Sequence, residues 1–361
     1  MNKKGHVKRK LHASTVTKSL SEYAKVPLES VDEGCSVKNL IVKTSSLGDI
    51  VHMLPALTDA AKKIPDATFD WVTESGFSEI PAWHPNVDKV IQNSFRRWRK
   101  QLFKKDTWAE YNAFKKELKQ TPYEKAIDSQ GLVKSAVIAR MSQGEPWGYD
   151  KHSIRDPFAS RLYQHTVSVP YKEHAVTRNR LMLANSMGYS IDDLPLDYGI
   201  AGNSGFKNAL EKLSHEMDIP DKFIMALHGT SRKAKEWPVK NWEKYIQEVG
   251  AVGYSVLFPW GNDEELARAN YLSEKYEKAI ALPKSSLTTL SGLIEKSSAV
   301  IGMDTGLMHI AAALDKKGIG IYPVTEPKLS GALAPSDKIE NIGGLLSLDV
   351  DLINGKMLKL L

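Results

Sequence analysis

Two successive rounds of strand and helix patterns constrain the fold of this chain more than any other feature. In the first round, short apolar runs predict strands at 39–44, 68–73, 87–92 and 123–128, and helical periodicity predicts helices at 50–63, 108–118 and 132–141. In the second, strands are predicted at 222–229, 254–260, 298–303 and 318–323, and helices at 242–249, 264–275, 287–295 and 307–314. Because such alternation is typical of parallel βαβ units, we expect an α/β protein with two Rossmann-like α/β/α domains that face each other across a cleft.

Chain length and local composition predict where the domains divide. A chain of 361 residues is long enough for two domains of ordinary size. A helix-rich zone at about 157–187 ends in a turn-prone stretch, 188–205, where we place the boundary. We therefore expect a basic extension without order at 1–38, a first domain at 39–200 and a second at 201–361, with a C-terminal segment that could pack back on the first domain. A transit peptide at 1–38 is disfavoured because it has one arginine and contains Glu22.

The charge of the chain is concentrated in two places. The net charge is +6, of which residues 1–38 contribute +4, and Arg96 to Lys105 contain six bases and no acid, so the rest is slightly acidic. This distribution excludes a uniformly basic coat for nucleic acid. One cysteine, Cys35, excludes an intramolecular disulfide and fits a reducing, cytosolic compartment. The sequence contains neither an apolar run long enough for a transmembrane helix nor a secretory signal pattern.

The segment KTSSLGD (43–49) lies where the first strand passes into the first helix. Gly48 and the small residues would let backbone approach a ligand, and a helix N-terminus offers free N–H groups. The segment matches neither a dinucleotide fingerprint nor a P-loop. Asp49 can be a helix cap or a general base facing the cleft. His52, three residues further on, is favoured as structural.

Two further segments of the first domain carry candidate binding groups. RRWRK (96–100) is either a solvated charged loop or a site that gathers phosphates and carboxylates, which arginine binds with two parallel hydrogen bonds. DSQGLVKS (128–135) again joins a strand to a helix. Gln130, Gly131 and Lys134 could line the same cleft, although Lys134 alone would be a surface residue.

The second domain has its polar segments at strand ends too. HGTSRKAKEWP (228–238) could bind a phosphate ester through the hydroxyls of Thr230 and Ser231 and the charge of Lys235, or form a helix cap with a basic turn. Glu265 could hold ribose hydroxyls or lie on a solvated helix.

MDTGLMH (303–309) is the most specific local signal. Asp304 and Thr305 suit a helix N-terminus, Gly306 permits close approach, and the N–H groups up to Leu307 suit a pyrophosphate. His309 is either its partner or a core histidine. The only D-x-D pattern, 349–351, is not tied to a predicted site, so no metal site is predicted.

Residues 39–361 resemble the heptosyltransferase I branch of glycosyltransferase family 9, whose members have the GT-B fold. The resemblance rests on segments in conserved order: LIVKTSSLGD, LPALTDA, FDWV, IPAWHP, RRWRK, DSQGLVKSA, RDPFAS, EHAV, HGTSRKAKEWP, PWG and MDTGLMHIAAALD. It implies inverting, metal-independent transfer of L-glycero-D-manno-heptose from ADP-heptose to the Kdo of Kdo-lipid A in lipopolysaccharide inner-core biosynthesis, without a cofactor. It also implies a cytoplasmic enzyme, peripheral on the inner membrane, that binds no nucleic acid.

The resemblance assigns a role to each matching residue. Asp49 would be the general base. Donor binding would fall to Thr230, Ser231, Lys235, Glu265, Asp304, Thr305, Gly306, Leu307 and His309. Acceptor binding would fall to Lys43, Arg96, Arg97, Arg99, Lys100, Gln130, Lys134, Arg155 and His174. Two departures are Ser285, which replaces an apolar neighbour of adenine, and the extension 1–38. The alternatives are a related GT-B transferase with another sugar or acceptor, such as a heptosyltransferase II, and, distantly, a nucleotide- or nucleic-acid-binding regulator.

Overall fold

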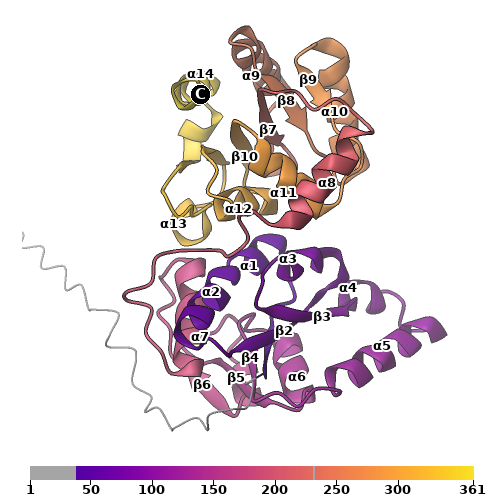
Figure 1. Cartoon of the computed structure of the whole chain (residues 1–361), viewed down its shortest axis with the longest axis vertical. Helices are drawn as coiled ribbons and strands as arrows, with labels where there is room; N and C mark the ends of the chain where they lie inside the picture. Colours follow the sequence, from indigo (N-terminus) through magenta and orange to yellow (C-terminus); the bar gives the residue numbers. More distant parts are fainter. Residues whose placement is uncertain (1–37, 231) are drawn as a thin grey trace, which may run out of the picture.

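Two parallel sheets of six strands, each covered by helices, dominate the computed structural model (Figure 1). The structure describes residues 38–230 and 232–361. The expectations for 1–37 and for Ser231 therefore lie outside the described residues. The two sheets confirm the predicted α/β class and the pair of Rossmann-like domains.

The first sheet has the order β3-β2-β1-β4-β5-β6, with every pair of neighbours parallel. Its strands are β1 (Lys38–Val42), β2 (Thr68–Glu74), β3 (Val87–Asn93), β4 (Lys125–Asp128), β5 (Glu145–Tyr149) and β6 (His165–Val167). The central strand β1 is buried from Asn39 to Val42 because helices cover both faces, which explains its continuous apolar run. The sequence patterns did not predict the short strands β5 and β6. The zone at 157–187 that we expected to be helix-rich contains β6 and one long helix.

The helices of the first domain agree with the patterns at 108–118, at 132–141 and within 157–187, differ at the first helix, and include two short helices, at 79–82 and 95–98, that were not predicted. They are α1 (Leu47–Val51), α2 (Leu54–Lys63), α3 (Glu79–Ala82), α4 (Phe95–Trp98), α5 (Lys105–Leu118), α6 (Val133–Met141) and α7 (Ala175–Met187). The single helix predicted at 50–63 is two helices, interrupted at His52 and Met53. Pro55 lies in the first turn of α2 and has no N–H to donate to a preceding turn, so a helix starts there rather than running through.

The second sheet has the order β12-β11-β10-β7-β8-β9 and is also parallel throughout. Its strands are β7 (Phe223–Leu227), β8 (Ser255–Phe258), β9 (Ala279–Ala281), β10 (Ala299–Met303), β11 (Gly318–Tyr322) and β12 (Ile339–Gly343). Its helices are α8 (Ser204–Ser214), α9 (Val239–Ala251), α10 (Asp263–Lys275), α11 (Leu287–Lys296), α12 (Gly306–Ala313), α13 (Pro327–Ser330) and α14 (Val350–Leu360). Strands β9 and β12 and helix α14 were not predicted. Helix α14 packs on α9 and β11 of the second domain, whereas α13 contacts α7 of the first.

The two domains meet through α1 and α12, which lie between the sheets (Figure 1). Each helix starts directly beyond a central strand, β1 or β10. Glycines make the contact close: a Cβ on Gly48 would lie 2.5 Å from the His309 ring, and one on Gly306 would lie 2.6 Å from Leu47. The loops beyond the carboxyl ends of the two sheets are thereby brought to one place, where open α/β sheets bind ligands.

Candidate active site

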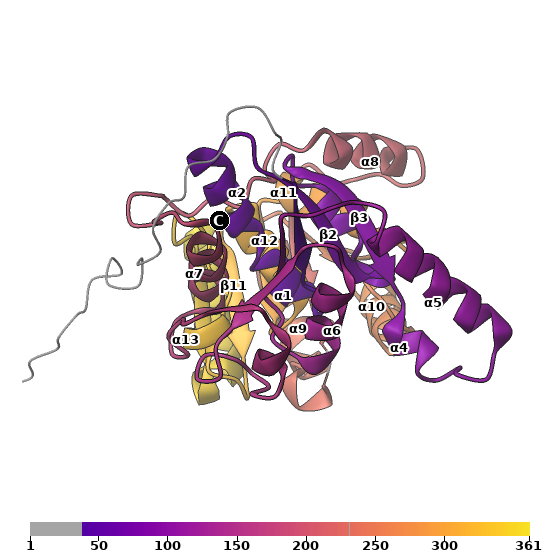
Figure 2. The same cartoon turned by 90° about the horizontal axis from the view of Figure 1, so that it is seen from below.

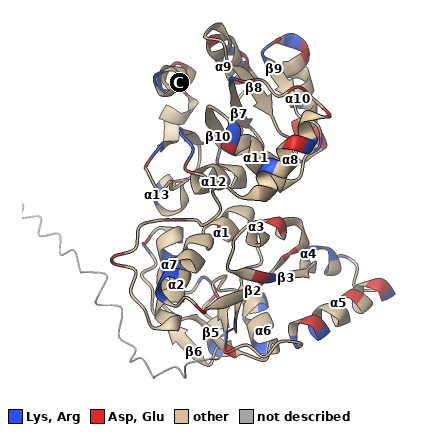
Figure 3. Ribbon diagram, in the orientation of Figure 1, with Lys and Arg blue, Asp and Glu red and all other residues tan. Residues whose placement is uncertain are grey.

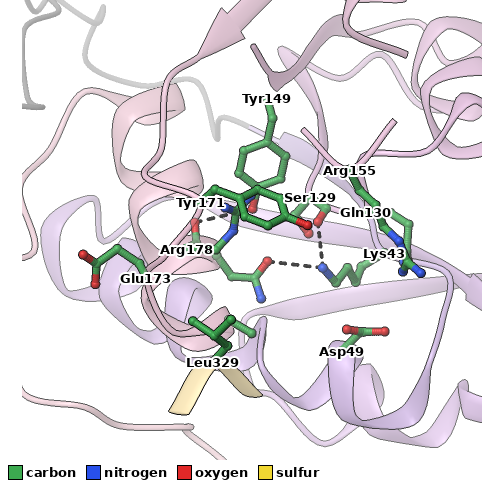
Figure 4. Close-up of a pocket in the computed structure, with 12 residues that line it drawn as sticks. Lys43, Asp49, Ser129, Gln130, Tyr149, Arg155, Tyr171, Glu173, Arg178 and Leu329 are labelled. Carbon is green, nitrogen blue, oxygen red and sulfur yellow. Dashed lines mark hydrogen bonds between the residues drawn. The ribbon is translucent and has the colours of Figure 1, made fainter. Parts of the chain in front are cut away.

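Two cavities open beside this domain contact, one on each side. The first has a volume of about 210 Å³ (Figure 4). Its lining is polar and mostly from the first domain: Lys43, Asp49, Ser129, Gln130, Tyr149, Arg155, Tyr171, Glu173, Ala175, Arg178, Asn179 and Leu329. Three of the expected acceptor-binding residues, Lys43, Gln130 and Arg155, therefore share one cavity with Asp49.

Asp49 is fixed by the first turn of α1. Ser46 is the N-cap, and the Asp49 Oδ2 atom accepts hydrogen bonds from the Ser46 N–H at 2.7 Å and the Ser46 hydroxyl at 3.0 Å. This capping box holds one carboxylate oxygen of Asp49 against the backbone of Ser46, while the side chain lines the cavity. Asp49 thus takes part in helix capping without being the N-cap itself, and its side chain also lines the first cavity.

Lys43 is a buried cation at the base of the first cavity. Its Nζ donates to the Ser129 carbonyl at 2.7 Å and to Asn179 Oδ1 at 3.3 Å (Figure 4). Burial lowers the pKa of Lys43, while the negative charges of Asp49 and Asp128 oppose that shift. A buried ammonium surrounded by neutral acceptors stabilises an anionic ligand group that enters the cavity.

Gln130 shapes the cavity wall more than the sequence suggested. Its Oε1 atom accepts the backbone N–H groups of Thr44 and Ser45, both at 3.1 Å, and so holds the loop between β1 and α1. Asp128 shapes the next turn, because its Oδ1 accepts the Gln130 N–H at 2.8 Å and its Oδ2 accepts the Tyr163 hydroxyl at 2.7 Å. The amide NH₂ group of Gln130 is the part that remains for a ligand.

The second cavity, of about 390 Å³, lies in the second domain and is more apolar. It is lined by Leu47, Leu227, Gly229, Thr230, Pro259, Trp260, Gly261, Asn262, Glu265, Ser285, Leu287, Leu290, Thr305 and Leu307. Glu265 reaches across its mouth, because its Oε2 accepts the Gly261 N–H at 2.7 Å and a Cβ on Gly229 would lie 2.5 Å from its Oε1. An apolar slot with a carboxylate at its rim suits a purine and the hydroxyls of a ribose.

A cation and a carboxylate form an ion pair next to Thr230 and Thr305 of the second cavity, although neither belongs to its lining. Lys235 Nζ lies 2.6 Å from Asp304 Oδ2, and both side chains are largely buried, at 13 % and 18 % exposure. Thr325 donates its hydroxyl to the same oxygen at 2.6 Å, and Thr230 donates to the Asp304 carbonyl at 3.2 Å. The next residue, Thr305, is the N-cap of α12, so the ion pair lies beside free N–H groups of a helix start.

Three histidines join the domains at this point. His52 Nε2 and His309 Nδ1 are 3.0 Å apart across the interface, and the His174 ring lies 5.8 Å from that of His52. Burial lowers the pKa of His309 to about 4, although Asp304 and Asp49 favour its charged form. His174 donates from Nε2 to the Gly331 carbonyl at 3.1 Å and accepts the Val176 N–H at Nδ1. His174, an expected acceptor ligand, is therefore an interdomain contact and an N-cap of α7.

The other expected acceptor-binding cations form a separate group on α4 and α6. They lie near Glu74. Burial raises the pKa of the Glu74 carboxyl, and the charges of Arg96, Lys134 and Arg99 oppose that shift. Arg97 instead forms an ion pair with Glu110, which also accepts the Trp98 indole N–H at 2.7 Å. These cations, with the exposed Lys100, line neither cavity.

Several cavity residues escaped the sequence analysis. Tyr149, Tyr171, Arg178 and Asn179 line the first cavity from β5, α7 and the loop before α7, in a region where no strand end was predicted. Thr325 follows β11, and a polar residue at that strand end was a signal that could have found it. Within residues 38–230 and 232–361, no three His, Cys, Asp or Glu side chains are arranged to hold a metal ion. No helix in this part of the chain is long and apolar enough to cross a bilayer.

Two Rossmann-like domains with cavities beside their contact are the architecture expected of a GT-B glycosyltransferase, and comparison with known proteins gives the family. Residues 111–343 match the model of glycosyltransferase family 9 (heptosyltransferase). The chain therefore belongs to this family, as the sequence motifs predicted, and is a glycosyltransferase of the heptosyltransferase type.

Curated relatives and solved structures agree with this assignment. The chain is 41% identical to lipopolysaccharide heptosyltransferase 1 of Pseudomonas aeruginosa over 82% of this chain and 81% of the relative. It is 39% identical to the Escherichia coli K12 protein of the same name over 83% of this chain and 92% of the relative. The structure of the E. coli heptosyltransferase WaaC with ADP superimposes with a TM-score of 0.82 at 36% identity, over 90% of this chain and all of WaaC. E. coli ADP-heptose lipopolysaccharide heptosyltransferase II, at 18% identity and a TM-score of 0.73 over 90% of this chain and 98% of that one, shares the fold.

Proposed function

We propose that this chain is a lipopolysaccharide heptosyltransferase 1, which transfers L-glycero-D-manno-heptose from ADP-heptose to the Kdo of Kdo-lipid A with inversion and without a metal. Two relatives at 41% identity carry that name, and a solved WaaC structure contains ADP-2-deoxy-2-fluoro heptose. The donor would occupy the second cavity and the acceptor sugar the first.

The donor half of the reaction needs stabilisation of a leaving diphosphate. Adenine fits between Trp260 and the leucines of the second cavity, and Glu265 would bind the ribose. The diphosphate would then lie by the start of α12 and Lys235, where helix N–H groups and an ammonium are already oriented. Groups fixed in place before the reaction stabilise the charge that develops on the leaving oxygen, which lowers the barrier.

The acceptor half needs a base and a site for an anionic sugar. The carboxylate of Kdo would pair with Lys43 and the guanidinium groups of Arg155 and Arg178 in the first cavity. Asp49 would take the proton from the attacking hydroxyl, and the heptose anomeric carbon would accept that oxygen as the bond to the diphosphate breaks. A single displacement of this kind, with attack from the face opposite the diphosphate, would invert the anomeric configuration.

One observation carries this proposal further than the others. The charges of Asp49 and Asp304, one from each domain, both favour the charged form of His309. The proposed base and the proposed diphosphate site are therefore both close to His309. Gly48, next to Asp49, also lies against the His309 ring, so two strand-end sites 255 residues apart in sequence are neighbours in space.

A transfer assay with ADP-heptose and O-deacylated Kdo-lipid A tests the proposal. We expect a heptosylated product whose anomeric configuration, read by NMR, is opposite to that of the donor, and an unchanged rate in EDTA. Absence of product with this acceptor, together with transfer to an already heptosylated core, would instead identify a heptosyltransferase of type II. Loss of activity in EDTA, restored by a divalent cation, would refute metal independence.

A further inference from the structure

The loop between α4 and α5 carries a cluster of exposed apolar side chains. Phe103 is fully exposed, at 104 %, and Leu102 and Trp108 are 52 % and 54 % exposed. A single exposed apolar residue needs no explanation, but three within seven residues form a patch. Helices α4 and α5 extend sideways from the first domain, which leaves the loop between them at the margin of the molecule (Figure 1, Figure 2).

The patch is held in place by its own contacts. The Trp108 indole N–H donates to the Leu102 carbonyl at 2.8 Å, which ties the loop to the first turn of α5. The Trp108 ring meets the edge of Tyr111 at 6.1 Å, and Tyr111 in turn packs against the buried Trp98 at 5.9 Å. The backbone of the loop is therefore anchored on both sides of Phe103, and the exposed Phe103 side chain extends from a fixed position.

Positive charge surrounds these apolar side chains. Between residues 99 and 106 there are four bases, all exposed, and a single acid, Asp106. In Figure 3 the ribbon near α4 and at the outer end of α5 has blue segments, with red ones beside them on α5. We name residues 99–108 the basic apolar tip; its bases are Arg99, Lys100, Lys104 and Lys105. Apolar side chains that enter the headgroup layer, flanked by cations that attract anionic lipid, are the two components of interfacial membrane binding.

The basic apolar tip is connected to the first cavity by further cations. Arg96 and Arg99 act on Lys134, which lies in the first turn of α6. The turn before α6 carries Gln130, which lines the cavity. The start of α6 thus links a residue of the proposed acceptor site with a lysine that the cations of α4 and the tip approach.

We propose that the basic apolar tip docks on an anionic phospholipid bilayer, with Phe103 and Leu102 entering the headgroup region. This inference extends the proposed function, since an acceptor anchored by acyl chains must be met at a membrane surface, and it assigns that contact to specific side chains. Phe103 and Leu102 bind neither sugar; they hold the enzyme beside the lipid that carries one.

Binding of the full-length protein to vesicles tests the docking directly. We expect sedimentation with vesicles of phosphatidylcholine and phosphatidylglycerol, and much weaker sedimentation with phosphatidylcholine alone. The double variant Leu102→Ser, Phe103→Ser should lower the partition coefficient on anionic vesicles at least about tenfold, since two large apolar side chains would no longer leave water and the burial of one alone is worth about that factor. Val252→Ser is the matched control, because Val252 is 53 % exposed in the second domain, and it should change nothing.

Insertion and docking are separated from sugar transfer by two further measurements. In a Cys35→Ser background, Phe103→Cys carrying an environment-sensitive fluorophore should shift its emission to the blue on anionic vesicles, whereas Val252→Cys should not. The double serine variant should keep wild-type turnover on O-deacylated acceptor and lose turnover only on acceptor embedded in vesicles.

Equal vesicle binding by wild type and the double variant would overturn the proposal. So would an unshifted fluorophore, or equally strong, tip-dependent binding to a single-stranded oligonucleotide. Vesicle binding without any heptose transfer would instead leave the docking intact and refute the proposed function.

Discussion

Replacement of Asp49 by asparagine separates the two roles that this side chain combines. The amide oxygen can still accept the Ser46 N–H and hydroxyl that Oδ2 accepts now, so the turn at the start of α1 keeps its hydrogen bonds. What disappears is the negative charge. At a helix N-terminus that charge stabilises by about 0.3–1 kcal/mol, which bounds the expected loss of folding stability.

The expected effect on catalysis is several times larger. Removal of a general base lowers turnover by about 10²–10⁴-fold, and this corresponds to roughly 3–5.5 kcal/mol on the barrier. We therefore expect Asp49→Asn to lose at least about 100-fold in kcat. Donor KM should stay near the wild-type value, because Asp49 lies in the acceptor cavity. Steady-state kinetics with varied ADP-heptose, and urea unfolding of the same preparations, supply the two numbers.

Asp349→Asn is the matched control. Asp349 caps α14 by accepting the N–H groups of Asp351 and Leu352, both at 3.1 Å, far from either cavity lining. It should lose a similar small amount of stability and no turnover. If Asp49→Asn folds normally and retains kcat within about threefold of wild type, the assignment of Asp49 as the base is wrong.

Three other substitutions test the donor site, the domain contact and the response to pH. Lys235→Met should lower kcat about 100-fold in the transfer assay, since it removes the cation proposed to stabilise the leaving diphosphate, and an unchanged kcat would refute that role. Gly48→Ala should destabilise the protein by about 1–3 kcal/mol in urea unfolding, because its Cβ would lie 2.5 Å from a buried ring. The control Gly355→Ala has open space around its Cβ and should stabilise α14 by up to about 1 kcal/mol. Equal effects of the two substitutions would contradict the close domain contact. Burial, and then the charge of Arg268, lower the pKa of His228 from 6.5 to about 4. Between these pH values only the unfolded chain binds the proton, so the contribution of His228 to folding stability should be complete above pH 6.5 and fall as the pH drops toward 4. His228→Gln, which can still donate to the Pro259 carbonyl, should flatten that fall in urea midpoints, and an identical slope would show that His228 does not cause it.

The sequence predicted the central strands and the sites at their ends because those signals are local. Strand β10, Asp304 and the start of α12 follow one another within a few residues, and the apolar run, the cap residues and Gly306 all indicate the same strand-to-helix turn. The edge strands β6 and β9 have three residues each and give no comparable signal. Their place is set by pairing with β5 and β8, which only tertiary structure supplies.

Contacts between segments far apart in sequence explain what the motifs left out of the site. Arg178 lines the first cavity because α7 packs on α2, and its guanidinium is held by the carbonyls of Pro170 and Ser153, at 3.2 Å and 2.6 Å. No residue spacing in the sequence predicts that arrangement. The same limit affects Arg97, which belongs to the specific RRWRK motif but is paired with Glu110 thirteen residues away. A motif thus identifies which residues the family shares, whereas the partners of each side chain decide whether its charge is available to a substrate. Arg155 lines the acceptor cavity, while Arg97 holds α4 against α5 and so supports the loop that we propose to meet the membrane.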